Sequence, residues 1–472
     1  MLERIFKLSE HNTTVKIEFM AGLATFLAMV YILLVNSELY SNPLGTGENV
    51  LGVPYGAIYI ATAVTAIIGC ILMGFMANLP FAMASGMGIN AFFIYTVCVG
   101  LGFTYANALV LILIDGLVFI LLTATGIRSK IFGAVPKTVR GSISAGIGLF
   151  IVFLGLQKAG IVVNNVNTCV ELGSFNILNP NSWESIMPML VSFITLITIC
   201  LLARKKNKAA ILCGLMVGAA WYFVLGFLTV PDFAGHLNLV SVSPVQAIKE
   251  FMDVSLFKVF AEGFDFGTVR AVHGGGELWF LILSTSFAFL LIDMFDTLGT
   301  LYGTCYRNNM IREDGTIENF EKAMMSDAVA TAFGAVCGVS TVTTYAESTT
   351  GIAAGGRTGL TSVFTACFFL VALFFTPLAA VVPGCVVAAA LVYVGILMAS
   401  DMKSLLGRPL EDVLPCIMTM VIIPFTCNIA YGIAFGIISH VVMYALCGRI
   451  KEVKLSSWVI ALLFVVMLLI TR

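Results

Sequence analysis

The most prominent feature of the chain is a series of long apolar windows. Stretches of about 17–25 mostly apolar residues, the length that a helix needs to cross a bilayer, recur about fourteen times. They lie at 17–37, 56–78, 81–99, 104–125, 141–157, 186–203, 208–229, 278–302, 321–338, 341–356, 358–381, 384–400, 411–427 and 429–447. Their apolar residues are continuous rather than alternating, which favours helices over a membrane β-barrel. The pattern therefore predicts an all-α polytopic membrane protein.

Composition narrows the class of protein further. Of the 472 residues, 59% are hydrophobic and 11% are charged, whereas an ordinary soluble protein carries roughly 25% charged residues. So few charges cannot cover a soluble enzyme, and the net charge of −1 argues against nucleic acid as a partner. The 12 cysteines are scattered without Cys-x-x-Cys spacing, so we interpret them as packing residues and predict neither a metal site nor a cofactor.

The distribution of Lys and Arg predicts the topology, because cytoplasmic loops are enriched in these residues. With fourteen crossings, twenty of the 25 Lys and Arg residues fall on one side, and only Lys158, Lys249, Lys258 and Arg270 fall on the other; the last one, Arg472, follows the final apolar run. The N-terminus is therefore predicted to be cytoplasmic. The loops predicted to face the cytoplasm are 126–140, 204–208, 304–320 and 401–410. The loops predicted to face outward are 39–55, 158–185 and 230–276. A last apolar run at 456–470 is short for a span, and the pattern leaves its topology open.

The long loop 230–276 divides the windows into seven and seven. An odd number of crossings in each half places the halves in opposite orientations, as in an inverted repeat. Windows three and ten occupy matching positions in this scheme, and both are poor continuous helices. Window three contains Pro80, Gly86 and Gly88, and window ten begins with the β-branched and aromatic run 341–345, which favours an extended backbone.

Paired interruptions of this kind point to the binding site of a transporter. Extended backbone at membrane depth is tolerated only where it is buried in protein or lines a cavity, and a helix that starts there offers free N–H donors. The competing interpretation is a glycine-rich packing seam between helices.

Carboxylic acids within the predicted spans are the main candidates for chemistry, because they are costly there and usually functional. Asp293 and Asp296 share one face of window eight, and Glu347 lies at the proposed helix start in window ten. In an apolar environment a carboxyl group binds a proton more readily than in water, so it can donate a hydrogen bond or carry a proton. The alternatives are helix–helix hydrogen bonding for the pair and a self-capped helix start for Glu347. For Asp327 and Asp115 the structural interpretation is favoured.

Asn90 lies just after the glycines of window three. Its amide both donates and accepts hydrogen bonds, which suits the edge of a heterocycle, and a purely structural role is the alternative. His440 is interpreted as a core residue. The sequence contains no Walker motif, no Ser-His-Asp arrangement and no metal-ligand cluster, so it predicts no enzyme.

Three motifs together resemble the AzgA-like branch of the nucleobase–cation symporters, which are proton-coupled permeases for adenine, guanine and hypoxanthine. They are Ser-Gly-Met-Gly-Ile-Asn-Ala-Phe-Phe at 85–93, Asp-Met-Phe-Asp-Thr-Leu-Gly-Thr at 293–300, and the stretch from Thr343 to Thr361. The resemblance extends over nearly the whole chain. It implies fourteen transmembrane segments in a seven-plus-seven inverted repeat, with broken helices and short strands in segments three and ten that cross beside the substrate.

The resemblance also implies a division into domains. Residues 1–140 and 277–382 would form a core domain, and 141–229 and 383–455 would form a gate domain. The external loop 230–276 would join the halves. The run 456–472 lies outside the fourteen segments and is not explained by the resemblance.

Functional residues carry over by position. Asp293 and Glu347 match the family's main substrate-binding carboxylates, Asp296 and Asn90 match further positions important for transport, and Asp327 matches a supporting acid. The branches for uracil and xanthine place a glutamate in segment eight, so Asp293 favours the purine branch.

These observations predict a multi-pass transporter in the cytoplasmic membrane that imports adenine, guanine or hypoxanthine by proton symport with alternating access. The predicted substrate contacts are Asp293, Glu347, Asn90, Phe92 and Tyr345, with Phe93 as a further candidate for stacking on the ring. The predicted proton-coupling residues are Glu347, Asp293, Asp296 and Asp327.

Two alternatives stay open. The first is an anion or sulfate carrier of the same fold, whose site should present a cation and few acids. The second is a carrier for another nucleobase, uracil or xanthine. The predicted partners are the nucleobase, the proton and the lipid bilayer, and a homodimer through the gate domain is implied by the resemblance alone.

Overall fold

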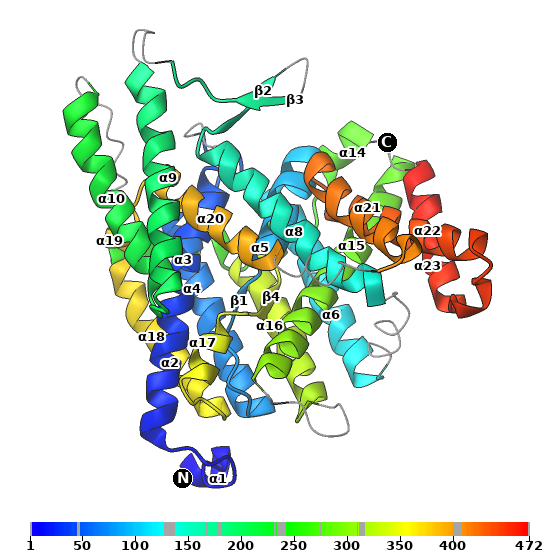
Figure 1. Ribbon diagram of the computed structural model, residues 1–472, viewed down its shortest axis with the longest axis horizontal. Coiled ribbons are helices and arrows are strands. Elements are labelled where there is room, and N and C mark those ends of the chain that lie inside the picture. Colours follow the sequence, from blue (N-terminus) through cyan, green and yellow to red (C-terminus); the bar gives the residue numbers. More distant parts are fainter. Residues whose placement is uncertain are drawn as a thin grey trace.

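The structure is a computed structural model that describes residues 2–44, 48–126, 137–165, 169–176, 182–230, 233, 242–273, 275–308, 310, 317–399 and 408–470. All fourteen predicted windows contain helix (Figure 1). The described residues include eight helices long and apolar enough to cross a membrane by length and composition, and four shorter apolar ones. The remaining windows are interrupted or, like α16 (Phe320–Cys337) and α21 (Leu410–Thr426), carry charged residues.

The other helices follow the chain in two halves with a short helical region between them. The first half contains α1 (Leu2–Phe6), α2 (Val15–Met29), α3 (Tyr31–Ser41), α4 (Tyr55–Leu72), η1 (Met73–Ala77), α5 (Met87–Ala91), η2 (Phe92–Gly100), α6 (Tyr105–Ala124), α8 (Lys137–Lys158), α9 (Ser182–Arg204) and α10 (Ala210–Thr229). The second half contains α15 (Gly275–Arg307), α17 (Ser348–Ala353), α18 (Gly359–Ala372), η4 (Leu373–Phe375), α19 (Thr376–Ala379), α20 (Gly384–Ala399), α22 (Ile429–Leu446), η6 (Ile450–Glu452) and α23 (Leu455–Ile470).

Several spans begin where a short polar side chain caps the first turn. Thr14 before α2, Thr104 before α6 and Asn428 before α22 each accept the backbone N–H three residues later, at 3.3, 3.1 and 3.3 Å. Such caps satisfy N–H groups that have no partner inside the helix. The sequence therefore sets these helix starts locally.

Windows three and ten are broken, as predicted, and meet in a two-stranded sheet. Strand β1 (Met83–Ser85) pairs antiparallel with β4 (Val342–Thr344), with Ala84 opposite Thr343. All six strand residues are buried, and further backbone hydrogen bonds extend the pairing past both ends. The strands satisfy each other's backbone groups, which is what allows extended chain inside the membrane. Each strand leads into a short helix, α5 after β1 and α17 after β4.

The helices pack in two groups. In the first, α6 packs on α16, α2 on α18, and α3 and α18 on α4, with the crossing strands among them. In the second, α8 packs on α20 and α21, α9 on α10 and α20, and α21 on α22. We call them the core group (α2–α6 and α15–α18) and the gate group (α8–α10 and α20–α22). The predicted division of the chain into a core and a gate domain, and their relative motion, stay predictions.

The predicted external loop 230–276 contains more structure than the sequence suggested. Its described part forms α12 (Pro244–Glu250), η3 (Phe251–Ser255), α13 (Lys258–Ala261) and α14 (Gly267–His273). Helix α12 packs on α4 and α13 packs on α6, because apolar side chains in these short helices are buried against the core group. A second two-stranded sheet, the hairpin of β2 (Val162–Asn165) and β3 (Cys169–Leu172), follows α8.

The last apolar run forms α23, which packs on α22 and places Phe464 6.0 Å from Phe287 of α15, between ring centroids. In Figure 1 the N-terminus lies at one end of the molecule, and the C-terminus lies at the level of α14 near the other end. The run left open by the sequence is thus a helix of 16 residues, shorter than the eight long apolar helices, that is directed away from the N-terminal end.

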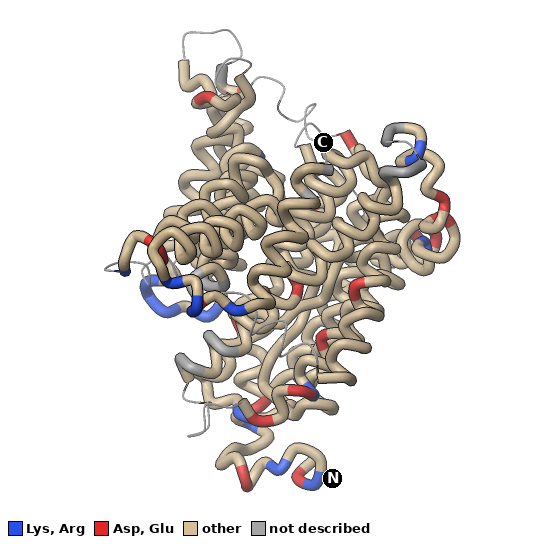
Figure 2. The backbone as a smooth tube through the Cα atoms, turned by 90° about the vertical axis from the view of Figure 1, so that its right-hand side faces the viewer, with Lys and Arg blue, Asp and Glu red and all other residues tan. Residues whose placement is uncertain are grey.

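Figure 2 shows where the positively charged residues lie along the molecule. In Figure 2 most of the Lys and Arg segments lie at mid-height or toward the end that carries the N-terminus.

We expect Lys206→Cys, in a background without the 12 native cysteines, to resist a membrane-impermeant maleimide in intact cells and to react after permeabilisation. Leu172→Cys in the hairpin of the loop 158–185, which is predicted to face outward, is the matched control; Leu172 is 67% exposed, and the cysteine should react in intact cells. Strong external labelling at position 206 would contradict this topology.

Candidate functional site

Glu347 occupies the start of the half-helix that follows β4. It is the residue before the first turn of α17, and its side chain makes no capping hydrogen bond there. Instead, the hydroxyl of Tyr31 donates to its Oε1 at 2.6 Å. The carboxyl group is thus held at the positive end of the half-helix by a side chain from the first span of the chain.

A cavity of about 460 Å³ reaches Glu347 from between the two helix groups. Its lining includes Thr349, Thr350 and Ala353 of α17, Tyr393 of α20, and Lys206, Asn207 and Lys208 after α9. Because the loop 204–208 is predicted to be cytoplasmic, the cavity opens toward the predicted cytoplasmic side. Its volume falls within the range usual for small-molecule sites.

The two acids of α15 face different partners. Asp293 is fully buried, and the hydroxyl of Thr331 on α16 donates to its Oδ2 at 3.4 Å. Asp296 is half-buried, accepts from the hydroxyl of Thr343 in β4 at 3.4 Å and interacts electrostatically with Glu347. The structure therefore brings Asp296 and Glu347 together at the crossing strands, with Asp293 deeper between α15 and α16.

Asp327 is buried on α16 and accepts from the Thr297 hydroxyl at 2.7 Å. This bond joins α16 to α15 at the residue directly after Asp296, and Asp327 also interacts electrostatically with the Asp296 carboxyl group. Neither Asp327 nor the α15 acids line the cavity that reaches Glu347. Their predicted roles in substrate binding or proton transfer stay predictions.

Asn90 is the centre of a buried polar network behind the crossing strands. Its Oδ1 accepts from the hydroxyls of Ser85, Ser340 and Tyr40, and its amide donates to Asn36 at 2.7 Å. The side chain is 1% exposed. These contacts connect α3, β1 and the residues just before β4 to α5. They correspond to the structural role that the sequence analysis gave as the alternative. A contact between Asn90 and the substrate stays a prediction.

The predicted aromatic contacts are also packed by protein. The ring of Phe92 lies 4.9 Å from that of Phe289 on α15, edge to face, and Phe93 lies 5.5 Å from Tyr40. The hydroxyl of Tyr345 donates to the carbonyl of Ser85, which clamps the end of β4 to β1. The stacking of any of these rings on a substrate stays a prediction.

Two residues at the cavity were missed by sequence reasoning. Tyr31 holds Glu347 directly, and Tyr393 faces the cavity from the gate group and interacts electrostatically with Glu347. Both lie within apolar windows, where a tyrosine is an ordinary packing residue. Only a hydroxyl placed in a predicted span could have drawn attention to them.

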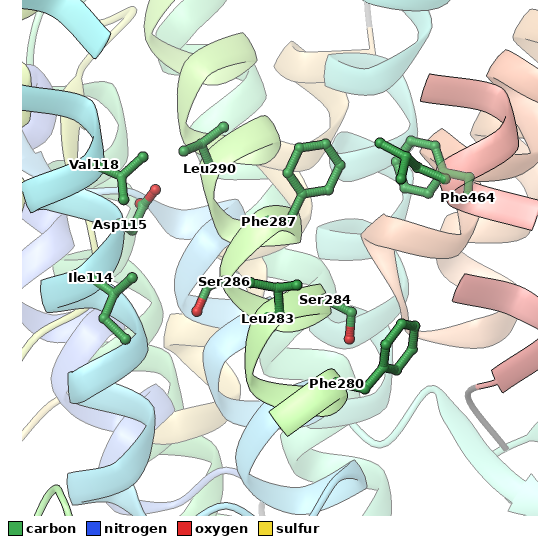
Figure 3. A pocket seen from close by; sticks show the side chains of 11 residues that line it. Ile114, Asp115, Val118, Phe280, Leu283, Ser284, Ser286, Phe287, Leu290 and Phe464 are labelled. Carbon is green, nitrogen blue, oxygen red and sulfur yellow. The ribbon is translucent and has the colours of Figure 1, made fainter. Parts of the chain in front are cut away.

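The residues interpreted as structural lie elsewhere. Asp115, 1% exposed, lines a separate apolar cavity of about 370 Å³ between α6, α15 and α23 (Figure 3). The His440 ring packs on Tyr444 at 4.2 Å. Within the described ranges, no group of three or more His, Cys, Asp or Glu side chains could hold a metal ion.

The fold and the cavity between two helix groups define a membrane transporter. The transmembrane domain of a cyanobacterial bicarbonate transporter, BicA, has the same inverted-repeat fold, with a TM-score of 0.61, 16% identity, and coverage of 89% of this chain and 97% of that one. The predicted fold class is confirmed.

Residues 16–435 match the sequence profile of the permease family Xan_ur_permease, so the chain belongs to this family. It is 35% identical to the adenine permease AdeP of Escherichia coli over 98% of this chain and 95% of the relative. It is 33% identical to the guanine/hypoxanthine permease PbuO of Bacillus subtilis over 99% of this chain and 100% of the relative. The protein is thus a multi-pass transporter of the cell membrane, as predicted, and not an enzyme.

Proposed function

We propose that this protein imports purine nucleobases, namely adenine, guanine or hypoxanthine, by proton symport with alternating access. The observation that carries the proposal is Glu347, a carboxyl group at the start of a half-helix where a cavity between the core and gate groups ends. The substrates in the relatives' names, adenine and guanine/hypoxanthine, support the same class.

The chemistry of a purine suits this arrangement. A purine presents ring N–H and exocyclic amino donors beside ring nitrogen acceptors. An ionised Glu347 accepts from adjacent donors, and a protonated one also donates. The hydroxyls of Thr349 and Thr350, which line the cavity, meet the acceptors.

The acids near Glu347 are proposed as the route of the proton. Asp296 interacts electrostatically with both Glu347 and Asp327, so these carboxyl groups influence each other's protonation. Asp293 is proposed as the second substrate-binding acid, reached when the core group rearranges around the purine. Asn90 and Tyr345 hold β1 in place through Ser85, and Phe92 packs on α15; all three are proposed as further substrate contacts. The protein is also proposed to form a homodimer through the gate group.

The anion-carrier alternative is less well supported. The solved neighbours of this fold include anion transporters, but their likeness extends to the fold alone. In an anion site the positive end of the half-helix would be left to the substrate. Here a glutamate occupies that position, with Asp296 beside it.

The test is uptake of radiolabelled adenine, guanine, hypoxanthine, uracil and sulfate by cells that lack their own carriers, with and without a protonophore. We expect accumulation of at least one purine, and its loss when the proton gradient collapses. Uptake of sulfate without any purine, or purine accumulation that the protonophore leaves unchanged, would contradict the substrate class or the coupling ion respectively.

A further inference from the structure

The cavity at Glu347 opens on the predicted cytoplasmic side, so something must close the opposite, external end. Three ends of helices meet there: the C-terminal end of α3 in the core group, and the last residue of α8 and the first residue of α20 in the gate group. By the predicted topology, all three lie at the outer surface. Their polar contacts cross from one group to the other.

Lys158, the last residue of α8, reaches across to α3. Its ammonium group donates to the carbonyl oxygens of Asn42 at 2.8 Å and of Glu38 at 3.3 Å. These are carbonyls of the last turn of α3 and its cap, where a helix carries partial negative charge. A positive charge from the gate group thus caps a helix of the core group.

Glu38 makes the reciprocal contact. Its Oε1 accepts from the side-chain amide of Asn42 at 2.9 Å, which holds the carboxylate in place. A Cβ built on Gly384 would lie 2.8 Å from the same oxygen, so the carboxylate sits directly against the first residue of α20. The N-terminal end of α20 carries partial positive charge, and the carboxylate also attracts the Lys158 ammonium.

A third contact bridges the groups at the same end. The hydroxyl of Thr96, at the middle of η2 in the core group, donates to the carbonyl of Cys427 after α21 in the gate group, at 2.5 Å. Thr96 is 7% exposed. The outer ends of the two groups are therefore joined by polar contacts that are partly buried.

We propose that Lys158 and Glu38 form an outer latch, a pair of reciprocal charge–helix contacts that holds the external side closed while the cavity is open inward. The latch rests on the alternating access of the proposed function. Each charge is matched by a helix end of the other group, so both lose their partners when the groups separate outside. Water that enters the outward-open cavity then hydrates the two charged groups. The latch therefore shifts the equilibrium toward the inward-open state but leaves the outward-open state accessible.

The test measures conformation in the absence of any purine. A single reporter, Ala353→Cys, replaces an exposed residue of the inner cavity in a background without native cysteines. Its rate of reaction with a maleimide in inside-out vesicles follows the inward-open population. We expect Lys158→Met and Glu38→Gln each to lower this rate, by about threefold or more, because both variants favour the outward-open state.

The matched control is Lys258→Met, which removes an external lysine paired with Glu262 at 2.5 Å within the predicted external loop. It should leave the labelling rate unchanged. Gly384→Ala is a second variant that keeps both charges but displaces the Glu38 carboxylate, and it should lower the rate in the same direction. Each protein is first shown to elute as a single folded species.

Labelling of folded Lys158→Met and Glu38→Gln at the parent rate would overturn the latch, as would an equal loss of labelling in Lys258→Met. If the charge variants fail to fold, Gly384→Ala is the test: labelling of this variant at the parent rate would overturn the latch. Purine uptake by the parent chain is measured separately. A result against the latch therefore does not contradict the proposed substrate class, and a result against the substrate class does not contradict the latch.

Discussion

Glu347→Gln is expected to abolish proton-driven accumulation of purine while leaving binding partly intact. Glutamine keeps a side-chain oxygen that can accept from the Tyr31 hydroxyl, so the start of α17 should keep its position. The amide cannot take up or release a proton. Substrate and proton then no longer share a coupling free energy, and transport becomes downhill only.

The measurement is the accumulation ratio of radiolabelled purine at several external pH values, with binding to the purified variant measured in parallel. Glu262→Gln, an exposed glutamate in the predicted external loop, is the control and should accumulate purine normally. If the Glu347→Gln protein still concentrates purine with normal pH dependence, Glu347 is structural. The proton must then travel through Asp293, Asp296 or Asp327.

Asp293→Asn is expected to weaken purine binding by about tenfold or more, because the amide loses a charge-assisted hydrogen bond worth about 1.5–3 kcal/mol. The structure makes Asp296→Asn the informative comparison, since Asp296 is less buried than Asp293 and interacts electrostatically with Glu347. Both variants keep the shape of the carboxyl group. Binding constants and thermal unfolding midpoints are measured on the same purified samples.

The two readouts separate binding from packing. If Asp293 serves only its hydrogen bond with Thr331, Asp293→Asn lowers the unfolding midpoint and leaves the purine dissociation constant unchanged. That result would refute its assignment to the substrate. A loss of affinity in Asp296→Asn alone would assign the second substrate-binding carboxylate to Asp296, one helical turn after Asp293.

Local chemistry predicted much of the fold. A run of apolar residues long enough for the bilayer forms a helix because the membrane offers its backbone no other partners, and each predicted window contains one. The β-branched run at 341–345 contains strand β4. The caps at Thr14, Thr104 and Asn428 mark helix starts. The short helices of 242–273 were missed because they are stabilised by packing on α4 and α6 rather than by a pattern of their own.

The sequence by itself determined that the chain is a helical membrane protein with two broken segments, and it singled out the acids that lie beside them. Those properties depend on hydropathy, propensity and charge, which act over a few residues. Only the tertiary structure decided that Tyr31 holds Glu347, 316 residues away, that Asn90 serves a buried network, and that Lys158 caps a helix of the other group. Such contacts depend on how distant segments pack, because a hydrogen bond needs its two atoms within about 3 Å and no local pattern specifies that distance.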